Sequence, residues 1–486
     1  MRRALAEAIS GRGQIAAVVA EAGTGKSRLF YEFKSLLPSG CKLLEAYSVS
    51  YGKASAWLPV LELLRDYFRI ASSDEAAVRR EKVRTALAAL DPGLNDTLPY
   101  LWGLLGIQEM PDPLALMDPQ IRQQRTRDAI KRVIVRESLV QPMVVIFEDL
   151  HWIDSQTQTL LDLVADSIGN TRVLLLVNYR PEYRHQWANK SYYLQLRLAA
   201  LGQESASELL AALLGESVEL DALKQLMIQR TQGNPFFIEE MVQALLDEGA
   251  LVRNGTVKMI RPLGQLRMPP TVQAILAARI DRLPTAEKDL LQTLAVVGRQ
   301  APLAVIMEMV VRPQLQQMLA NLQTAEFIYE QAGSGAAVGC EFKHALTQDV
   351  AYSSLLMERR RVLHERVGAT LESLYGEQLD DYVGELARHY NSSDNANKAV
   401  EYLSRAGSQA MQRSAFAEAQ GHLQQGLERI KVLPESRGRD AQELKLANAL
   451  VQVLVFTRGY SAPARVEMVA RASALAEKGG DLTCKT

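Results

Sequence analysis

The fold of this chain is decided by one stretch, Val18-Val19-Ala20-Glu21-Ala22-Gly23-Thr24-Gly25-Lys26-Ser27-Arg28-Leu29. The apolar run over residues 15–20 predicts a short buried strand, and the apolar spacing from Leu29 to Leu37 predicts a helix. A glycine-containing loop between a strand and a helix presents backbone N–H groups and a helix N-terminus to phosphate groups. This context predicts a phosphate-binding loop at the edge of an α/β sheet.

The residues of this loop predict ATP and Mg²⁺ as ligands. We expect Lys26 to reach the β- and γ-phosphates and the Ser27 hydroxyl to bind Mg²⁺. The usual pattern G-x-x-x-x-G-K-[ST] has glycine where this chain has Ala20. Since alanine tolerates positive φ poorly, either this position is extended or nucleotide binding is weakened. An incidental turn is the alternative interpretation. The predicted nucleotide-binding residues of the loop are Gly23, Gly25, Lys26, Ser27 and Arg28.

Composition limits the class of protein. The chain has 486 residues, of which 48% are hydrophobic, and a net charge of −1, which predicts several globular domains with ample cores. Near-zero net charge gives no argument for nucleic acid or an acidic membrane as a partner. The cysteines Cys41, Cys340 and Cys484 are too scattered for a zinc site or a disulfide framework. With neither a signal peptide nor a membrane-spanning stretch in view, we expect a cytoplasmic protein.

The stretch from Pro142 to Asp154 predicts the second half of the site. Its apolar run predicts a strand buried on both faces, as in a parallel sheet, and the carboxylates Glu148 and Asp149 follow. Ligands bind at the carboxyl ends of such strands. We assign Glu148 to Mg²⁺ and Asp149 to orientation of the attacking water, so both are catalytic candidates. The alternative is a strand that ends in a polar turn.

A further buried strand over residues 172–177 ends in the triplet Asn178-Tyr179-Arg180. A cationic side chain at this position can sense the γ-phosphate, and Arg180 is the candidate. A surface arginine after a strand is the alternative. Residues 91–119, rich in Pro, Gly and Asp, are expected to form a loop.

The remaining sequence predicts mainly helical regions. Gly233-Asn234-Pro235 is a turn followed by a helix start at Pro235. Leu403 and Ala406 recur 43 residues later as Leu446 and Ala449, which favours helical-hairpin repeats over an ordinary helical bundle. We expect four domains. The first is a P-loop NTPase core at 1–202, without an upstream adenine-side segment, and a helical lid at 203–262 follows it. The third is a winged-helix-like domain at 263–345 with the loop 331–339 as its tip, and the last consists of tetratricopeptide-like repeats at 346–486, incomplete at their end.

Five motifs in this order resemble one class of proteins. They are Ala22 to Leu29, Phe147 to Asp154, Asn178 to Glu182, Gly233 to Glu240 and Phe342 to Tyr352. The set is similar to the STAND class of signalling NTPases, and within it to bacterial predicted ATPases with an Orc1-like AAA domain and a tetratricopeptide tail. The resemblance covers nearly the whole chain.

The resemblance implies a switch that is closed with ADP and open to partners with ATP. It places Pro235 near the adenine, and it matches His344 to a winged-helix histidine that touches the β-phosphate. Read from the sequence alone, His344 is a packed helix histidine. Relatives often carry a class III adenylyl cyclase domain before the ATPase or a DNA-binding domain after the repeats.

Several functions follow from these patterns. The first is an ATP-binding, nucleotide-gated switch and scaffold with slow ATP hydrolysis, whose repeats bind protein partners and which self-associates with nucleotide. The alternatives are a regulatory ATPase fragment of a multidomain adenylyl cyclase, an ATP-dependent transcriptional regulator that binds DNA, and a scaffold without nucleotide. DNA is the weaker expectation, because the helix 271–283 offers only Arg279 and Arg282 as outward cations.

Overall fold

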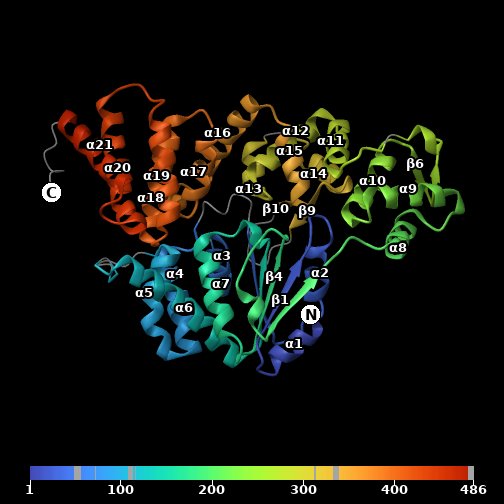
Figure 1. Ribbon diagram of the computed structural model, residues 1–486. Coiled ribbons are helices and arrows are strands. Elements are labelled where there is room, and N and C mark those ends of the chain that lie inside the picture. Colours follow the sequence, from blue (N-terminus) through green and yellow to red (C-terminus); the bar gives the residue numbers. More distant parts are fainter. Residues whose placement is uncertain are drawn as a thin grey trace.

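The structure is a computed structural model that describes residues 1–48, 56–71, 73–107, 113–114, 116–266, 268–310, 313–331 and 339–479. Its lower layer in Figure 1 is an α/β sheet, and its upper layer is a row of helices. The chain leaves the sheet at one side and returns above it. Residues from the second half of the sequence therefore lie over the first half (Figure 1).

The α/β layer contains a five-stranded parallel sheet in the order β2-β3-β4-β1-β5. Every residue of β3 and β4 is buried, as expected for parallel strands covered on both faces. Because β4 lies between β1 and β3, the segments that follow β1 and β3 flank its carboxyl end. The strands are β1 (Gln14–Val19), β2 (Lys42–Tyr47), β3 (Met143–Glu148), β4 (Val173–Tyr179) and β5 (Tyr193–Arg197).

Helices cover both faces of this sheet. One face packs against α1 (Arg2–Ile9) and α2 (Lys26–Lys34) through residues such as Phe30 and Val18. The other face packs against a larger helical layer through alternate residues such as Ile15. This layer contains α3 (Leu58–Tyr67), α4 (Ala76–Leu90), α6 (Pro119–Val140) and α7 (Ser155–Ser167). The predicted α/β P-loop fold is confirmed.

The prediction of a loop over residues 91–119 is wrong for residues 92–105. The segment contains the 3₁₀ helix η2 (Pro92–Thr97) and α5 (Leu98–Leu105), and α6 begins at Pro119. Leu98, Leu101 and Leu104 are buried, so the segment adds to the core. Pro92, Pro99 and Pro119 occupy the first turns of helices and Gly106 ends α5, which are positions where these residues favour helix boundaries.

Two helical regions follow the sheet. The lid helices are α8 (Gln203–Leu214), α9 (Asp221–Thr231) and α10 (Pro235–Asp247), followed by the hairpin of β6 (Leu251–Asn254) and β7 (Thr256–Met259). The winged-helix-like region contains α11 (Val272–Arg282), α12 (Thr285–Val297), α13 (Leu303–Met309), α14 (Leu315–Thr324) and a small sheet of β8 (Gln300–Pro302), β10 (Gly339–Phe342) and β9 (Ile328–Gln331). Of the predicted loop tip, 331–339, residues 332–338 fall outside the described residues.

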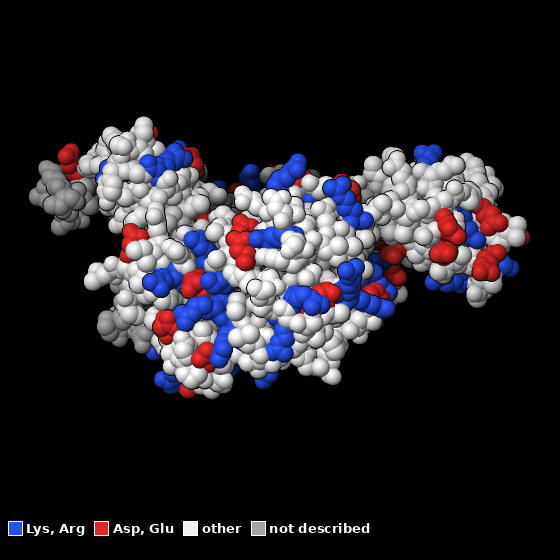
Figure 2. All heavy atoms as spheres, turned by 60° about the horizontal axis from the view of Figure 1, so that its bottom comes forward, with Lys and Arg blue, Asp and Glu red and all other residues white. Residues whose placement is uncertain are grey.

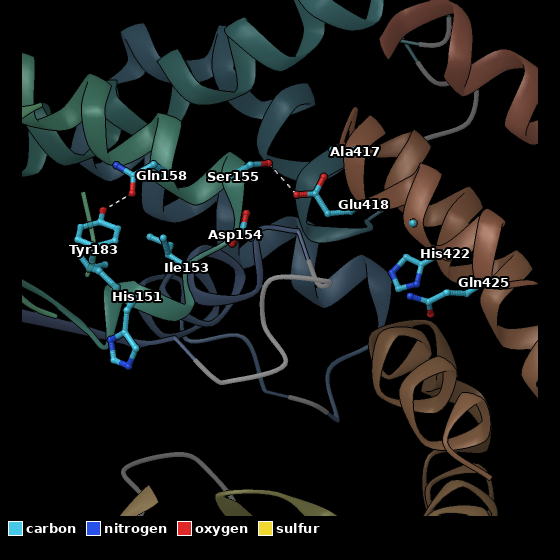
Figure 3. A pocket seen from close by; sticks show the side chains of 12 residues that line it. His151, Ile153, Asp154, Ser155, Gln158, Tyr183, Ala417, Glu418, His422 and Gln425 are labelled. Atoms are coloured by element: carbon cyan, nitrogen blue, oxygen red, sulfur yellow. Dashed lines mark hydrogen bonds between the residues drawn. The ribbon is translucent and has the colours of Figure 1, made fainter. Parts of the chain in front are cut away.

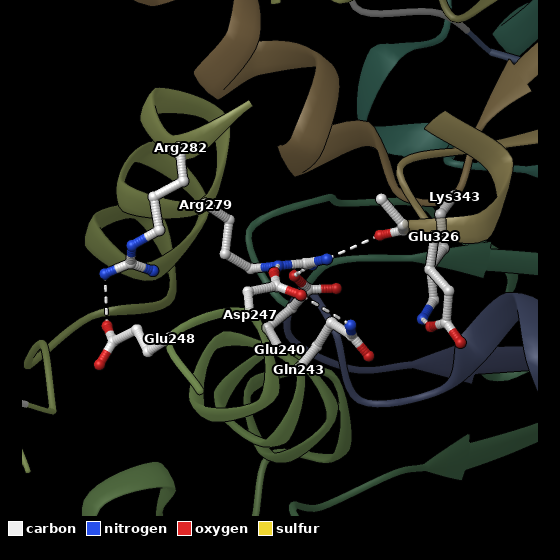
Figure 4. Close-up of polar contacts among 9 residues, drawn as sticks. Glu240, Gln243, Asp247, Glu248, Arg279, Arg282, Glu326 and Lys343 are labelled. Carbon is white, nitrogen blue, oxygen red and sulfur yellow. Dashed lines mark hydrogen bonds and ion pairs between the residues drawn. The ribbon is translucent and has the colours of Figure 1, made fainter. Parts of the chain in front are cut away.

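A buried arginine joins the lid helices to the winged-helix-like region (Figure 4). Arg279 of α11 forms ion pairs with Glu240 and with Asp247 of α10, the latter at 2.8 Å, and donates to the backbone oxygen of Ala325 at 2.6 Å. Its guanidinium also lies 4.6 Å from the centroid of the Phe327 ring. Arg279 and Glu240 are about fully buried, so loss of either partner would leave an uncompensated buried charge between the two regions.

From α16 on, the C-terminal helices form antiparallel neighbours that pack in sequence order, whereas α15 packs on α11 and α12 (Figure 1). They approach closely at small residues: a Cβ built at Gly407 of α18 would lie 2.8 Å from Leu423 of α19. The helices are α15 (Ala345–Ser353), α16 (Met357–Leu374), η7 (Gly376–Asp381), α17 (Val383–Asn391), α18 (Ala396–Gln412), α19 (Phe416–Ile430), α20 (Arg437–Arg458) and α21 (Pro463–Gly479). The domain boundaries predicted at 202, 262 and 345 stay predictions.

Polar contacts tie these helices back to the α/β layer. Arg65 of α3 and Arg79 of α4 both pair with Asp381 of η7, at 2.7 and 2.8 Å. The Ser155 hydroxyl at the start of α7 donates to Glu418 of α19 at 2.9 Å. The C-terminal helices thus rest on the helical layer of the sheet. Across the described residues, no helix combines the length and the apolar composition needed to cross a bilayer.

Candidate functional site

The loop after β1 has the backbone of a phosphate-binding loop. Gly23 and Gly25 adopt positive φ, at 78° and 101°, which glycine permits without steric cost. Helix α2 begins at Lys26, directly after Gly25. The Lys26 ammonium folds back over the loop and donates to the backbone oxygens of Ala20 and Glu21, each at 2.9 Å. Burial lowers the pKa of Lys26 because the charged form is poorly solvated. The same burial means that an anionic ligand would meet the ammonium with little competing water.

Ala20 is compatible with this loop. It is not among the residues with positive φ, and its N–H donates to the backbone oxygen of Tyr179 at 3.2 Å. The position therefore continues the pairing of β1 with β4 and does not need glycine. The sequence left open either an extended conformation at Ala20 or weakened nucleotide binding. The structure favours the first alternative, because Ala20 has no positive φ.

The structure brings the loop and the β3 carboxylates together. The Ser27 hydroxyl donates to Glu148 Oε2 at 2.8 Å, and the Asn178 amide donates to the same oxygen at 2.8 Å. Burial raises the pKa of Glu148, while these two hydrogen bonds favour its charged form. Ser27 and Glu148 thus place two oxygen atoms of the kind that Mg²⁺ prefers beside the phosphate-binding loop.

Asp149 leaves the strand in a left-handed conformation, with φ 58° and ψ 44°. Its N–H donates to Asn178 Oδ1 at 2.7 Å, so one buried amide side chain fixes both acidic residues. Its carboxylate faces Arg299, whose Nη1 lies 3.4 Å from Asp149 Oδ2. Arg299 also pairs with Glu341 of β10 at 3.1 Å. A cation from the winged-helix-like region therefore reaches the acidic half of the site.

Sequence reasoning did not single out Asn178 or Arg299. Asn178 carried a usable signal, because it is a polar residue within the fully buried strand β4. Arg299 follows the glycine that ends α12 and carried no such signal. Its approach to Asp149 depends on how the second half of the chain folds back over the sheet.

Arg180 lies near the site, whereas the Arg28 side chain points away from it. The Arg180 guanidinium lies 6.0 Å from the centroid of the Trp152 ring, and its charge helps to lower the pKa of His344, after burial and Arg299. Arg180 is therefore near the site. Arg28 points outward from α2, with 74% of its side chain exposed, and pairs with Glu32. In this arrangement only its backbone belongs to the loop.

The start of α10 sits on the phosphate-binding loop. The Asn234 amide donates to the backbone oxygen of Ala22 at 3.1 Å, and the N–H of Phe236 donates to that of Gly23 at 3.2 Å. A Cβ at Gly23 would lie 2.9 Å from Asn234, so glycine is needed for the close approach. Pro235 lies between these contacts, in the first turn of α10. Gly233-Asn234-Pro235 thus begins α10 and also brings this helix onto the phosphate-binding loop.

His344 contacts the start of α10 from the winged-helix-like region. Its ring stacks on Phe236, with centroids 4.2 Å apart, and its Nδ1 accepts from the N–H of Leu346 at 3.0 Å. Burial lowers the pKa of His344 to about 4, with Arg299 acting in the same direction and Asp149 against it. The imidazole is therefore neutral near pH 7, and because Nδ1 accepts, the proton lies on Nε2. Nε2 can donate to an anion.

Over the described residues, no group of three or more His, Cys, Asp and Glu side chains could hold a metal by itself. Mg²⁺ is commonly bound by one or two protein oxygens together with phosphate oxygens of a substrate. The pair of Ser27 and Glu148 beside Lys26 fits this second type of site.

The comparisons with known proteins agree with this geometry. The family model of the AAA ATPase domain matches residues 1–177, which include the phosphate-binding loop and both carboxylates. The chain therefore contains an AAA-type ATPase domain.

A curated relative extends over nearly all of the chain. An uncharacterized protein of Rhizobium meliloti (strain 1021) is 28% identical over 477 residues, which are 94% of this chain and 44% of the relative. The chain thus spans less than half of the relative's length.

Solved structures are similar to this chain only at low sequence identity and low TM-score. A STAND protein with a tetratricopeptide repeat sensor from Pyrococcus horikoshii aligns with 100% of this chain and 78% of its own, at 13% identity and a TM-score of 0.42. Cdc6p from Pyrobaculum aerophilum aligns with 72% of this chain and 93% of its own, at 13% identity and a TM-score of 0.28. With scores this low, the assignment rests on the family model and on the geometry of the site.

Proposed function

We propose that this protein is an ATP-binding, nucleotide-gated switch that hydrolyses ATP slowly. The observation that carries the proposal is the hydrogen bond of 2.8 Å between Ser27 and Glu148, which are 121 residues apart in sequence. It joins the phosphate-binding loop to the acidic end of β3, the combination that phosphoryl transfer requires.

Each residue then has a defined task. The loop N–H groups and Lys26 bind the phosphates, and Ser27 and Glu148 hold Mg²⁺, which would neutralise charge on the phosphate oxygens. Asp149, close to this pair, orients the attacking water. Neutral His344 donates through Nε2 to a phosphate oxygen, and Pro235 lies on the side of the nucleoside.

The gating part of the proposal rests on where the second half of the chain touches the site. The lid helices contact the loop through Asn234 and Phe236. The winged-helix-like region contacts Asp149 through Arg299 and contacts Phe236 through His344. A ligand shifts a conformational balance only through different contacts with the two states. Because Arg299 pairs with a carboxylate proposed to act on the γ-phosphate side, a change of nucleotide would change this pair directly.

Protein partners fit this chain better than DNA. Both arginines of α11 are engaged with the lid helices: Arg279 is buried among carboxylates, and Arg282 pairs with Glu248 (Figure 4). On the face shown in Figure 2, basic side chains gather near the centre with acidic ones among them. A nucleic-acid surface usually carries a continuous basic stripe. We propose that the repeats bind proteins and that self-association follows the nucleotide state.

The first test measures ATP binding. With Mg²⁺ present, isothermal titration calorimetry of the full chain should show one ATP site, and Lys26→Ala should abolish it because the loop loses its cation. Lys34→Ala is the matched control, since Lys34 lies at the far end of the same helix and pairs with Glu45. Equal ATP affinity of Lys26→Ala and the wild type would refute the proposed site.

The second test separates hydrolysis from binding. Asp149→Asn removes the charge that orients water and keeps the side-chain shape. We expect ATP affinity close to the wild type, and phosphate release lowered by a factor of about 100 or more. Phosphate release at the wild-type rate would contradict the role of Asp149 while leaving ATP binding in place.

A further inference from the structure

The cleft drawn in Figure 3 lies between the 3₁₀ helix η3 (Leu150–Trp152) and α19 and has a volume of about 640 Å³. Its unpaired polar atoms are both ring nitrogens of His151 and Oε2 of Glu418, and all of them are buried. The His151 ring also points away from Glu418 (Figure 3). Because these atoms have hardly any accessible surface, they cannot orient a ligand.

A second cleft, of about 770 Å³, lies where the helical layer of the sheet meets the C-terminal helices (Figure 1). One wall comes from α5 and from the starts of α4 and α6, and the other comes from η7 and α18. Its volume lies within the range of small-ligand sites in proteins. Because the two walls come from distant parts of the chain, a ligand that spans them would contact both layers.

Arg413, at the end of α18, brings a poorly compensated cation to this second cleft. Its Nη1 donates to Gln409 Oε1 at 3.2 Å, and its Nε is buried without a partner. Within the part of the chain that the structure describes, Arg413 forms no ion pair. Burial lowers the pKa of Arg413 to about 10, and the charge of Arg65 acts in the same direction. An anion beside this guanidinium would favour its charged form.

The Nη2 atom of Arg413 lies next to the opposite wall. A Cβ built at Gly106, the residue that ends α5, would lie 3.8 Å from Nη2 and would meet nothing else within 4 Å. Nη2 has no partner among the described residues, and unlike Nε it keeps accessible surface. A group bound at Nη2 would therefore also touch α5, so even a short ligand can contact both walls.

The face of α5 beside Nη2 leaves room for an apolar group. Tyr100, Gly103 and Gly106 line the cleft at intervals of three residues, so they lie on one side of the helix. Both glycines are exposed, and Tyr100 is half-buried. A Cβ built at Gly103 would meet only the end of the Leu114 side chain, at 3.7 Å. A ring or a short aliphatic chain can thus lie on α5 next to the guanidinium.

The other charges of this cleft favour a ligand with a single negative charge. Among the described residues that line it are five basic and four acidic side chains, so their formal net charge is +1. Asp381 already pairs with Arg65 and Arg79, and Asp380 pairs with Arg405 at 3.1 Å. Both carboxylates act on the pKa of Arg413, so they lie near the bound anion and would repel a second negative charge on it.

We propose that this cleft binds a small monocarboxylate with an apolar or aromatic body. The carboxylate accepts from Arg413 Nη2, and the body lies on α5 at Tyr100 and Gly103. A charge-assisted hydrogen bond beside an apolar wall supplies both orientation and contact area. The site uses neither the phosphate-binding loop nor the β3 carboxylates, so it does not depend on the proposed nucleotide switch.

The test uses four probes with a phenyl body and the full chain without nucleotide. In calorimetry, hydrocinnamate should bind saturably. Hydrocinnamamide has the same shape without the charge, and it should bind about tenfold or more weakly. Phenethylamine, with the opposite charge, should not bind. Phenylsuccinate, with a second carboxylate, should bind more weakly than hydrocinnamate. Since nucleotide is absent, failure of the ATP site would not affect these results.

Two variants locate the binding in the cleft. Arg413→Gln removes the proposed donor and should weaken hydrocinnamate binding by about tenfold or more. Arg405→Gln is the matched control, since Arg405 lies on the same helix and lines the same cleft but pairs with Asp380. It should change the affinity by less than about threefold. Gly103→Leu should remove binding by filling the space on α5, and helices favour leucine over glycine.

Several results would overturn the proposal. The first is the absence of saturable hydrocinnamate binding up to about 10 mM. Equal or tighter binding of hydrocinnamamide, phenethylamine or phenylsuccinate would contradict the proposed class of ligand. Equal losses in Arg413→Gln and Arg405→Gln would exclude the proposed contact. Thermal unfolding shows whether each variant is folded, and if Arg413→Gln is not, unchanged affinity in Gly103→Leu overturns the proposal by itself.

Discussion

The contact between Arg299 and Asp149 offers the sharpest test of the proposed switch. Arg299→Gln removes the cation that reaches from the winged-helix-like region to the acidic end of β3. The pair is 3.4 Å apart, with 21% of each side chain exposed. Glu341 holds Arg299 from within its own region, so loss of Arg299 breaks a contact between regions and leaves Asp149 without its cation.

The magnitude follows from the distance and the burial. At 3.4 Å, the attraction between two unit charges is about 1 kcal/mol in water and about 5 kcal/mol at an effective dielectric constant of about 20. The cost of removing the guanidinium from water offsets part of this attraction. A net loss of about 1–2 kcal/mol is therefore reasonable, which changes the ratio of closed to open protein by a factor of about 5–30.

The assay is the release of a fluorescent ADP analogue in a stopped-flow instrument. If the region that carries Arg299 must lift for ADP to leave, Arg299→Gln should release the analogue about 5–30 times faster than the wild type. Glu341→Gln should release it no faster than the wild type, because Arg299 can then pair with Asp149 alone. Arg359→Gln is the control, since Arg359 pairs with Asp289 away from the site.

The reasoning would be refuted by a release rate of Arg299→Gln within about twofold of the wild type, which is the scatter expected for neutral surface changes. It would also be refuted if Glu341→Gln released the analogue as fast as Arg299→Gln. Added salt should reduce the difference between Arg299→Gln and the wild type, because mobile ions screen a partly exposed pair.

Two further predictions concern buried polar groups. Asn178→Ala leaves the N–H of Asp149 without a partner and removes one of the two donors to Glu148 Oε2, of which Ser27 remains, so the free energy of unfolding in urea should fall by about 1–3 kcal/mol and phosphate release should be lost. An unchanged urea midpoint would contradict this. Arg279→Met leaves Glu240 buried and unpaired, which should cost about 3–5 kcal/mol, whereas Arg282→Met at the exposed neighbouring pair should cost less than about 1 kcal/mol.

The sequence predicted those parts of the site whose conformation is determined by residues close to one another along the chain. The strand, the glycines and Lys26 are contiguous, and their conformation depends on residues within a few positions. The β3 run likewise identifies a buried parallel strand with two acids after it. Because carboxyl ends of parallel strands meet at one edge of a sheet, Ser27 and Glu148 come together without knowledge of the rest of the fold.

The unpredicted part depends on how distant segments pack. Composition alone favoured a loop around Pro92 and Gly106, but the buried leucines of α5 outweigh these residues and use them as helix boundaries. Arg299 lies 150 residues after Asp149, in a region whose placement over the sheet no local pattern encodes. The contact between residues 234–236 and the phosphate-binding loop likewise depends on the packing of segments that are far apart in the sequence.

The conformation of Asp149 explains how two adjacent acids can belong to one site. In a continuing strand, successive side chains point to opposite faces of the sheet. Asp149 instead adopts a left-handed turn that costs an ordinary residue about 1–2 kcal/mol. The hydrogen bond from its N–H to Asn178 offsets this cost.

A glycine would adopt the same turn more readily but would supply no carboxylate. The charge of Asp149 acts both on Lys26, whose pKa it raises against the effect of burial, and on Glu148, whose pKa it raises together with burial. Asp149 is therefore electrostatically coupled to the loop and to the metal side of the site. The same turn exposes its carboxylate to Arg299, so the acid that would orient water is also the acid that the winged-helix-like region contacts.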